Sequence, residues 1–279
     1  MYLINQIGYF PAYGLEHQHR FTKEFPKKIS VTMDSIVMDK SSDINILVQC
    51  EPPNLYVDFY GMVLNNHQNF DLVLAYDPRI LDIPGINAIE FCPIGSWINS
   101  NLELDKKNQI SYLMSSKING HDYHMRFMIL RWLEKNKLQN FDIFWHRSPP
   151  KIPDKNDFFI NAKFNVACEN QVMDNMFTEK LIDCFKTKTV PIYYGCQNLQ
   201  KYFNPRGVIA FNTIEQFDEI MRNLTSDVYD DMLPYIEENY ELSKPYWEKN
   251  VYQRIEDIVS ERFFDVDQTN NFLMNYILD

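Results

Sequence analysis

The chain has 279 residues, enough for one large or two ordinary domains. Its composition, 45% hydrophobic and 15% aromatic, supports a sizeable core and excludes a disordered chain. The formal net charge of −11 argues against a nucleic-acid partner, whose phosphates would be repelled, but leaves room for a small anion held by local positive groups.

The first half of the chain contains short apolar runs rich in β-branched and aromatic residues, which are typical of strands. The runs are 2–9, 28–33, 44–50, 70–76 and 88–92. Loops rich in Pro, Asp and Asn separate them. A charged stretch, LELDKKN at 102–108, follows the last run and is the best candidate for a domain boundary.

The second half alternates strands and helices more regularly. Strands are predicted at 110–116, 141–146, 164–169, 190–195 and 207–211, and helices at 122–137, from Thr178, and at 214–224. The unbroken apolar run at 164–169 fits a central parallel strand. The remainder is predicted to be helical, broken at Pro234 and Pro245. The pattern indicates an α/β architecture with mostly parallel sheets, whose ligands bind at the carboxyl ends of the strands.

The cysteines and the apolar pattern indicate the compartment. The five cysteines form no CxxC pair, and most lie within apolar runs, which predicts reduced, buried thiols. No stretch approaches 18 apolar residues, and the first residues lack a signal-peptide pattern. We therefore expect no membrane span and a cytoplasmic location, in a bacterium or in the host cytoplasm if the protein is viral.

Five charged or polar residues gather where the strand at 164–169 leads into the next helix. The strand ends at Glu169, Asn170 follows, and Thr178 is a plausible N-cap of the helix. The amides of the first helical turn form an anion site, and Lys180 in that turn suits a phosphate. Glu179 could accept hydrogen bonds from sugar hydroxyls. On spacing alone, the more common explanation is that Glu179 complements the helix dipole and Lys180 is a solvated surface residue.

A second cation and a carboxylate occupy comparable positions. Arg126 lies near the start of the predicted helix 122–137, where it could complete a pyrophosphate clamp or be an ordinary surface arginine. Glu51 directly follows the apolar run 44–50 and precedes two prolines, which makes it a candidate general base or a turn-capping carboxylate. The competing bases in the same half are Asp71, Asp77 and Glu90.

Metal-binding patterns are weaker. Asp265 and Asp267 form a DxD pattern like that of metal-dependent sugar transferases, but in the helical C-terminal part a helix cap is the more common explanation. His17 and His19 are separated by one residue but lack further ligands at suitable spacing. His124 is similarly uninformative. Neither a Walker loop nor a GxGxxG motif is present.

A series of residues resembles the donor domain of the α-1,3-fucosyltransferases, the bacterial enzymes above all. The series consists of Glu169-Asn170, Thr178-Glu179-Lys180-Leu181, the strand VPIYYG at 190–195 and Phe203-Asn204-Pro205. The match is convincing over about 164–220, weaker back to about 110, and loose over the first hundred residues.

The resemblance implies two Rossmann-like domains facing across a cleft (a GT-B fold), and an inverting, metal-independent sugar transfer. The expected division is an acceptor-side domain at 1–105, a donor-binding domain at 106–250, and a helical tail at 251–279 that packs back on the first domain. No cofactor is implied; the expected partners are a nucleotide sugar, GDP-fucose or a UDP-sugar, and a glycan or glycoprotein acceptor.

The resemblance also assigns residues. Lys180 and Arg126 would bind the diphosphate, and Glu51 would be the base or a contact to the acceptor. The remaining donor contacts would come from Glu169, Asn170, Met176, Phe177, Thr178 and Glu179. The family usually has tyrosine where this chain has Met176, so the donor could be a nucleotide sugar other than GDP-fucose, such as UDP-xylose. Two alternative functions stay open: a non-catalytic module that binds a glycan or a nucleotide sugar, and a metal-dependent DxD transferase.

Overall fold

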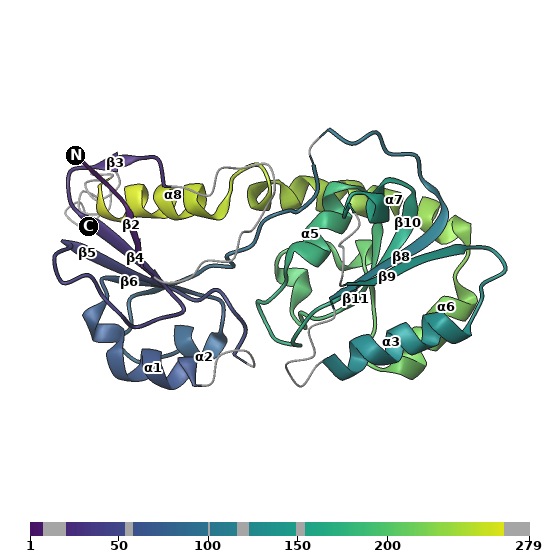
Figure 1. The fold of residues 1–279 in the computed structure, drawn as a ribbon, viewed down its shortest axis with the longest axis horizontal. Helices are drawn as coiled ribbons and strands as arrows, with labels where there is room; N and C mark the ends of the chain where they lie inside the picture. The colour runs from purple at the N-terminus through teal and green to yellow at the C-terminus, as the bar shows by residue number, and fades with distance from the viewer. Residues whose placement is uncertain (8–20, 54–57, 100, 116–122, 149–153, 265–279) are drawn as a thin grey trace, which may run out of the picture.

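The computed structural model describes residues 1–7, 21–53, 58–99, 101–115, 123–148 and 154–264. It confirms the α/β prediction, with two five-stranded sheets in which all neighbouring strands are parallel (Figure 1). The first sheet has the order β2-β4-β5-β6-β7, and the second has the order β12-β11-β10-β8-β9.

The strands fall on the predicted apolar runs. The first sheet contains β2 (Asn5–Ile7), β4 (Ile29–Met33), β5 (Ile44–Val48), β6 (Leu72–Ala75) and β7 (Ala88–Glu90). The second contains β8 (Lys107–Ser115), β9 (Asp142–Ser148), β10 (Ala162–Cys168), β11 (Val190–Tyr194) and β12 (Ile209–Ala210). The run expected as one strand at 2–9 is divided, because β1 (Tyr2–Leu3) pairs antiparallel with β3 (Glu24–Phe25) while β2 joins the sheet.

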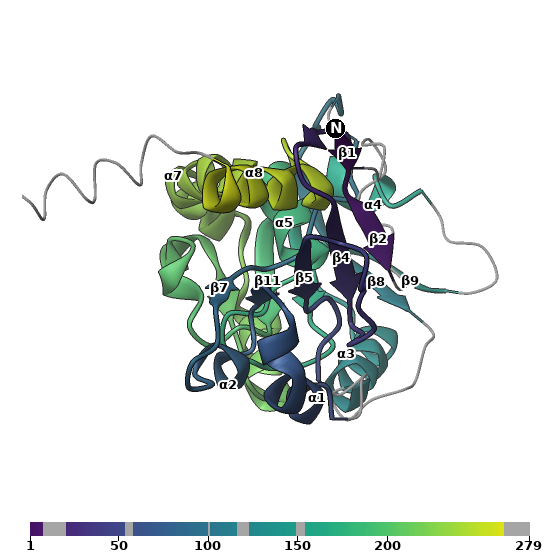
Figure 2. The same ribbon diagram turned by 90° about the vertical axis from the view of Figure 1, so that its left-hand side faces the viewer.

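Helices cover both faces of each sheet. The first sheet is flanked by α1 (Phe59–Asn66) and α2 (Pro78–Leu81) on one face and by α8 (Val251–Phe263) on the other (Figures 1 and 2). The second sheet is accompanied by α3 (Tyr123–Lys135), α4 (Asp157–Ile160), α5 (Glu179–Lys186), α6 (Ile214–Asn223) and α7 (Ser226–Ser243). Four 3₁₀ segments connect these elements: η1 (His67–Asn69), η2 (Leu199–Lys201), η3 (Pro205–Gly207) and η4 (Lys244–Tyr246).

Strand periodicity explains how the first sheet is buried on both faces. Ile46 and Val48 of β5 pack in one cluster with Ile255 of α8, whereas Leu47 between them packs with Val63 of α1. Because successive side chains of a strand point to opposite faces, one apolar run supplies both cores. The last described helix thus packs on the first sheet. The domain boundaries at 105 and 250 stay predictions, since a boundary is defined by independent folding.

The predicted break at Pro234 is wrong. Pro234 lies inside α7, which continues for 18 residues from Ser226 to Ser243. Proline removes one backbone donor, but Pro234 is exposed, so water can hydrate the carbonyl that loses its partner. Pro245 does follow the end of α7, in η4. Among the described residues, no helix combines the length and apolar composition needed to cross a bilayer.

Candidate functional site

The end of β10 and the start of α5 are joined by a buried carboxylate. Glu169 continues the ladder to β11, donating its N–H to the Tyr194 carbonyl at 2.8 Å. Its carboxylate accepts the N–H and the hydroxyl of Thr178 at 2.8 and 2.6 Å. Thr178 is the N-cap of α5, as the sequence predicts, and its Oγ1 accepts the Lys180 N–H. Glu169, with no exposed surface, therefore fixes the direction in which α5 begins.

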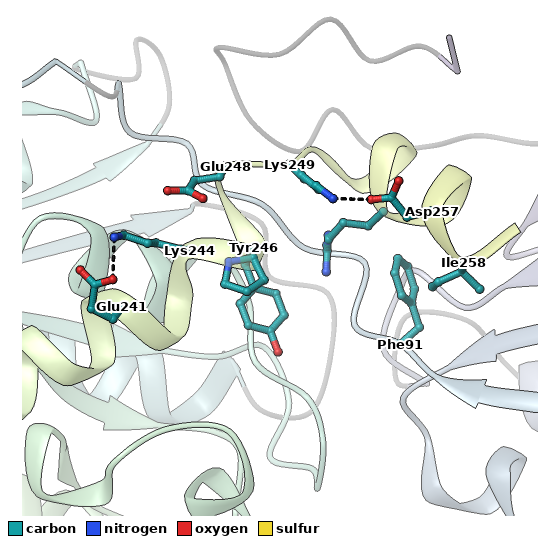
Figure 3. A pocket seen from close by; sticks show the side chains of 10 residues that line it. Phe91, Glu241, Lys244, Tyr246, Glu248, Lys249, Asp257 and Ile258 are labelled. Atoms are coloured by element: carbon teal, nitrogen blue, oxygen red, sulfur yellow. Dashed lines mark hydrogen bonds and ion pairs between the residues drawn. The ribbon is translucent and has the colours of Figure 1, made fainter. Parts of the chain in front are cut away.

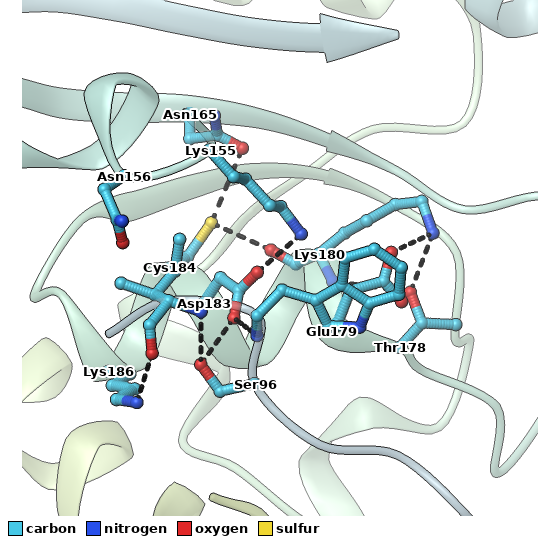
Figure 4. Close-up of polar contacts among 12 residues, drawn as sticks. Ser96, Lys155, Asn156, Asn165, Thr178, Glu179, Lys180, Asp183, Cys184 and Lys186 are labelled. Atoms are coloured by element: carbon cyan, nitrogen blue, oxygen red, sulfur yellow. Dashed lines mark hydrogen bonds and ion pairs between the residues drawn. The ribbon is translucent and has the colours of Figure 1, made fainter. Parts of the chain in front are cut away.

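Lys180, in the first turn of α5, is mostly buried and paired, with 19% of its side chain exposed. Its Nζ lies 2.9 Å from Thr178 Oγ1 and 3.1 Å from Glu179 Oε1 (Figure 4). It also lies 3.4 Å from Glu169 Oε2. Burial alone would lower the pKa of Lys180, but the charges of Glu179 and Glu169 outweigh it and the pKa is raised. The unfavourable placement of a cation at a positive helix end is thereby offset by two carboxylates.

Arg126 of α3 reaches the same place from the neighbouring helix. Its side chain is buried, with 3% of the residue exposed, and its Nη1 donates to Asn170 Oδ1 at 2.7 Å. The positive charge of Arg126 also acts on Lys180, opposing the rise of that lysine's pKa. The structure therefore brings together Arg126, Asn170 and Lys180 at the carboxyl end of β10, as the parallel-sheet rule predicts.

A third cation, Lys155, was not singled out by the sequence. Its Nζ lies 2.6 Å from Asp183 Oδ2, one turn along α5 from Glu179 (Figure 4). Burial would raise the pKa of Glu179, yet Lys180 and then Lys155 outweigh it and lower the pKa to about 2. Lys155 precedes a four-residue helix in an irregular segment. No local pattern marks it, because its place beside α5 depends on the fold.

Met176 and Phe177 lie in the core. Met176 is 2% exposed and Phe177 is fully buried, so neither side chain presents a surface to a ligand in this structure. The Phe177 ring packs against Tyr202 and Tyr246, with centroids 5.0 and 5.3 Å apart. Side-chain contact with the donor would require this packing to open, so for both residues such contact stays a prediction that the structure does not favour.

The acidic residues of the first half occupy different edges of its sheet. Glu51 follows the carboxyl end of β5, as predicted, and its N–H donates to Asp34 Oδ2 at 2.9 Å. Asp77 is buried as the N-cap of α2 and paired with Arg79. Asp71 lies at the amino end of β6, where its Oδ2 accepts the Asn45 N–H. Asp71 is thus on the edge away from the strand ends that bind ligands.

Asp34 is a residue that sequence reasoning missed. It directly follows β4, the same signal that singled out Glu51 after β5. Its carboxylate accepts the N–H groups of Cys50 and Glu51 at 2.7 and 2.9 Å. Burial raises the pKa of Asp34 to about 7, against the two backbone hydrogen bonds. Asp34 therefore fastens the turn that carries Glu51.

The predicted metal patterns are not tested by these contacts. Asp265 and Asp267, and His17 and His19, lie outside the described residues. His124 is exposed on α3. Among the residues that the structure describes, no group of three or more His, Cys, Asp or Glu side chains could hold a metal ion.

A separate hollow of about 630 Å³ lies where η4 meets α8 (Figure 3). The Arg254 guanidinium lies 5.0 Å from the centroid of the Phe91 ring and 5.3 Å from that of the Tyr246 ring, and it donates to the Ile94 carbonyl. None of the predicted site residues lines this hollow. Its lining residues come from the end of the first sheet, at Phe91, and from the segment 241–258 that leads from α7 into α8.

The comparisons with known proteins bear on this site. The family model for the C-terminal part of glycosyltransferase family 10 (fucosyltransferase) matches residues 104–255, more than half of the chain. The chain belongs to glycosyltransferase family 10. The matched region contains Arg126, Asn170 and Lys180, so the resemblance seen in the sequence is confirmed.

Individual relatives of this family 10 protein match over shorter stretches. An α-(1,3)-fucosyltransferase of Helicobacter pylori is 37% identical over 68 residues, 24% of this chain and 14% of that protein. An α-(1,4)-fucosyltransferase of Arabidopsis thaliana is 32% identical over 68 residues, 23% of this chain and 17% of that protein. The chain thus aligns with less than a fifth of the length of either relative.

A solved structure shows the fold of the family 10 protein. A crystal structure of an α1,3-fucosyltransferase, 16% identical, superposes with a TM-score of 0.54 over 95% of this chain and 90% of the other. The predicted GT-B fold, with two Rossmann-like domains, is thereby confirmed.

Proposed function

We propose that this family 10 protein transfers a sugar, fucose by family membership, from a nucleoside-diphosphate sugar to a hydroxyl of a glycan acceptor. The observation that carries the proposal is the convergence of Arg126, Asn170 and Lys180 on the start of α5. A diphosphate is the ligand class that two cations and a helix N-terminus fit best.

Lys180 would change partners when the donor binds. In the structure its charge is balanced by Glu179 and Glu169. A diphosphate at the helix start would draw the Lys180 ammonium towards its oxygens, since the amides and Arg126 favour the same anion. Glu179 would then be released to accept hydrogen bonds from the ribose or the sugar, the role that the resemblance implies.

The reaction we propose is a single displacement. The acceptor hydroxyl gives its proton to a carboxylate, Glu51 by our assignment, and its oxygen forms a bond to the anomeric carbon. The bond from that carbon to the diphosphate breaks, and its electron pair leaves with the nucleoside diphosphate. Attack from the opposite face inverts the anomeric centre. Arg126, Lys180 and the α5 amides stabilise the charge on the leaving group, so the proposal requires no metal ion.

Asn170 and Glu169 support this chemistry without reacting. Asn170 accepts the Arg126 hydrogen bond and so orients the guanidinium at the end of β10. Glu169 holds Thr178 and with it the first turn of α5. A bound donor is expected to keep both arrangements. The cytoplasmic location and the identity of the acceptor remain part of the proposal.

The test is a panel of GDP- and UDP-sugars, read first by thermal shift and then by product formation. At a donor concentration of about 100 times Kd, binding adds about 2.7 kcal/mol to the free energy of unfolding. Transfer of sugar separates the enzyme from a non-catalytic binding module, and NMR of the early product reports inversion. Full activity in excess chelator would exclude the metal-dependent alternative; loss of activity would refute metal independence.

Matched variants test the site. Arg126→Ala and Lys180→Ala should each lower kcat/KM by about 10²–10³-fold, as for other groups that stabilise a developing anion. Arg131→Ala, on the exposed face of α3, should stay near the wild-type rate. Near-normal rates in both site variants would refute the assignment. Equal losses in all three would show that changes in α3 and α5 act through stability.

A further inference from the structure

Asn175 occupies an unusual position three residues before the N-cap of α5. Its φ is 60°, in the left-handed region, which asparagine tolerates better than other residues that carry a Cβ. The residue is 5% exposed. A residue keeps such a backbone conformation only when contacts with its surroundings hold it there. The constraint here is the set of hydrogen bonds made by its amide.

The orientation of the Asn175 amide is fixed by its neighbour Asn198. The Asn175 N–H donates to Asn198 Oδ1 at 2.8 Å, so Asn198 Nδ2 is the group that donates to Asn175 Oδ1, also at 2.8 Å. This leaves Asn175 Nδ2 facing the Tyr76 carbonyl, to which it donates at 3.2 Å. Every polar atom of Asn175 except its backbone carbonyl oxygen therefore has a hydrogen-bond partner at Asn198 or Tyr76.

The partners of Asn175 belong to both sheets. Tyr76 directly follows β6 of the first sheet, and Asn198 follows β11 of the second. Asn175 Oδ1 also lies 2.8 Å from the Tyr202 hydroxyl, which is 2.8 Å from Glu90 Oε1 at the end of β7. Lys201 pairs with Glu90 and lies 3.5 Å from Asn175 Oδ1. The network joins the carboxyl edges of the two sheets.

Further hydrogen bonds continue the network to the turn that carries Glu51. Gln49 Oε1 accepts the N–H groups of Tyr76 and Asp77 at 3.2 and 3.0 Å. The Tyr76 hydroxyl is 3.5 Å from the Cys50 carbonyl, directly before Glu51. On the other side of Asn175, Thr178 lies only three residues away. A short, polar, buried route therefore connects the candidate base to the start of α5.

We propose that Asn175 is a positioning residue that sets the placement of the acceptor-side sheet relative to the donor helix. The inference rests on the proposed function, because the two halves of the site have meaning only if one sugar bridges them. A displacement of about 1 Å between reacting groups can cost about 100-fold in rate, so one buried amide can matter for transfer without touching the substrate.

Two variants separate the amide from the backbone. Asn175→Gly keeps the left-handed conformation and removes every side-chain bond. Asn175→Asp keeps the shape and the acceptor for Tyr202, but it replaces the donor that faces Tyr76 by an oxygen. The matched control is Asn136→Asp, whose Nδ2 donates to the Trp132 carbonyl at 2.8 Å within α3 and its C-terminal end. The control variant loses a similar bond that does not join the sheets.

The kinetic test compares kcat/KM for the acceptor with Kd for the nucleotide. In both Asn175 variants, kcat/KM for the acceptor should fall about 10-fold or more, while the Kd for the nucleotide stays within about twofold. Asn136→Asp should keep both values. A purely structural role would lower the melting temperature and both values together. Wild-type acceptor kinetics in both Asn175 variants would overturn the proposal.

A distance measurement tests the placement without any activity. Spin labels at Gln68→Cys, in η1 directly after α1, and at Glu134→Cys, in α3, would report the separation of the two domains, whose helices α1 and α3 are seen in Figure 1. We expect one narrow distribution in the wild-type background and a broader or shifted one with Asn175→Asp. An unchanged distribution would overturn the proposal. If the protein transfers no sugar, the proposed function fails, but this result still decides the role of Asn175.

Discussion

Gly195→Ala tests how the strand end positions the donor helix. A Cβ at Gly195 would lie 2.4 Å from the Tyr193 hydroxyl oxygen and 2.5 Å from Glu169 Cγ. Both neighbours are buried, and Glu169 is held by two hydrogen bonds to Thr178. One of them must therefore shift by roughly 1 Å, which for overpacking costs about 1–3 kcal/mol.

The two consequences of Gly195→Ala are measured separately. The melting temperature should fall by about 2–12 °C, since each kcal/mol corresponds to about 2–4 °C in a chain of this size class. If Glu169 moves, the cap of α5 is weakened, and nucleotide binding should weaken about fivefold, the equivalent of about 1 kcal/mol. Isothermal titration calorimetry with the tightest-binding donor from the panel measures this change in nucleotide affinity.

Gly85→Ala is the matched control. Gly85 has a φ of +78°, and nothing lies within 4 Å of the Cβ that alanine would add. The Gly85→Ala variant should have a free energy of unfolding lower by about 1–2 kcal/mol because of backbone strain. Its nucleotide affinity should be unchanged. If Gly195→Ala keeps both the wild-type melting temperature and the wild-type affinity, the contact between Gly195 and Glu169 does not position α5, and the reasoning is refuted.

Three further changes have expected outcomes. The folded-state pKa of Asp34 is raised to about 7, so its contribution to stability is present at low pH and is lost as pH rises through 7. Between about pH 5 and 8, this loss should lower the free energy of unfolding by on the order of 2–3 kcal/mol. Asp34→Asn should flatten the decline, as measured by urea unfolding across that pH range. Ser96→Ala removes a 2.7 Å hydrogen bond to buried Asp183 and should cost about 1.5–3 kcal/mol in the same assay. Thr178→Ala should weaken nucleotide binding in calorimetry, and Thr178→Ser should restore it by supplying the same hydroxyl.

Each of these changes has a contrary result. An unchanged pH dependence in Asp34→Asn would mean that the Asp34 carboxyl does not titrate in this range. For Ser96, the control is Ser42→Ala, whose partly buried hydroxyl donates to Asp39 at 3.2 Å and should matter by less than about 0.5 kcal/mol. Equal losses at Ser96 and Ser42 would contradict the special role of the buried acceptor. Failure of Thr178→Ser to restore binding would show that the threonine methyl group matters more than the cap.

The sequence predicted most of the elements and one half of the site. Apolar runs of five to eight residues predicted the parallel strands, because a strand buried on both faces needs a continuous apolar surface. Thr178, Glu179 and Lys180 could be placed at a helix start because N-capping depends on residues only a few positions apart. The parallel-sheet rule then predicted that Arg126 and Asn170 would lie near them.

Only the tertiary structure decided what these residues contact. The sequence could not show that Lys180 is balanced by Glu169, that Lys155 approaches Glu179, or that Phe177 is buried under Tyr246, because each of these contacts joins segments far apart along the chain or separated by a loop. It likewise gave no sign that Asn175 would meet Tyr76, 99 residues away. Local patterns determine helix capping and the course of the apolar strands, whereas the balance of charge within the site and the placement of the two sheets depend on long-range packing.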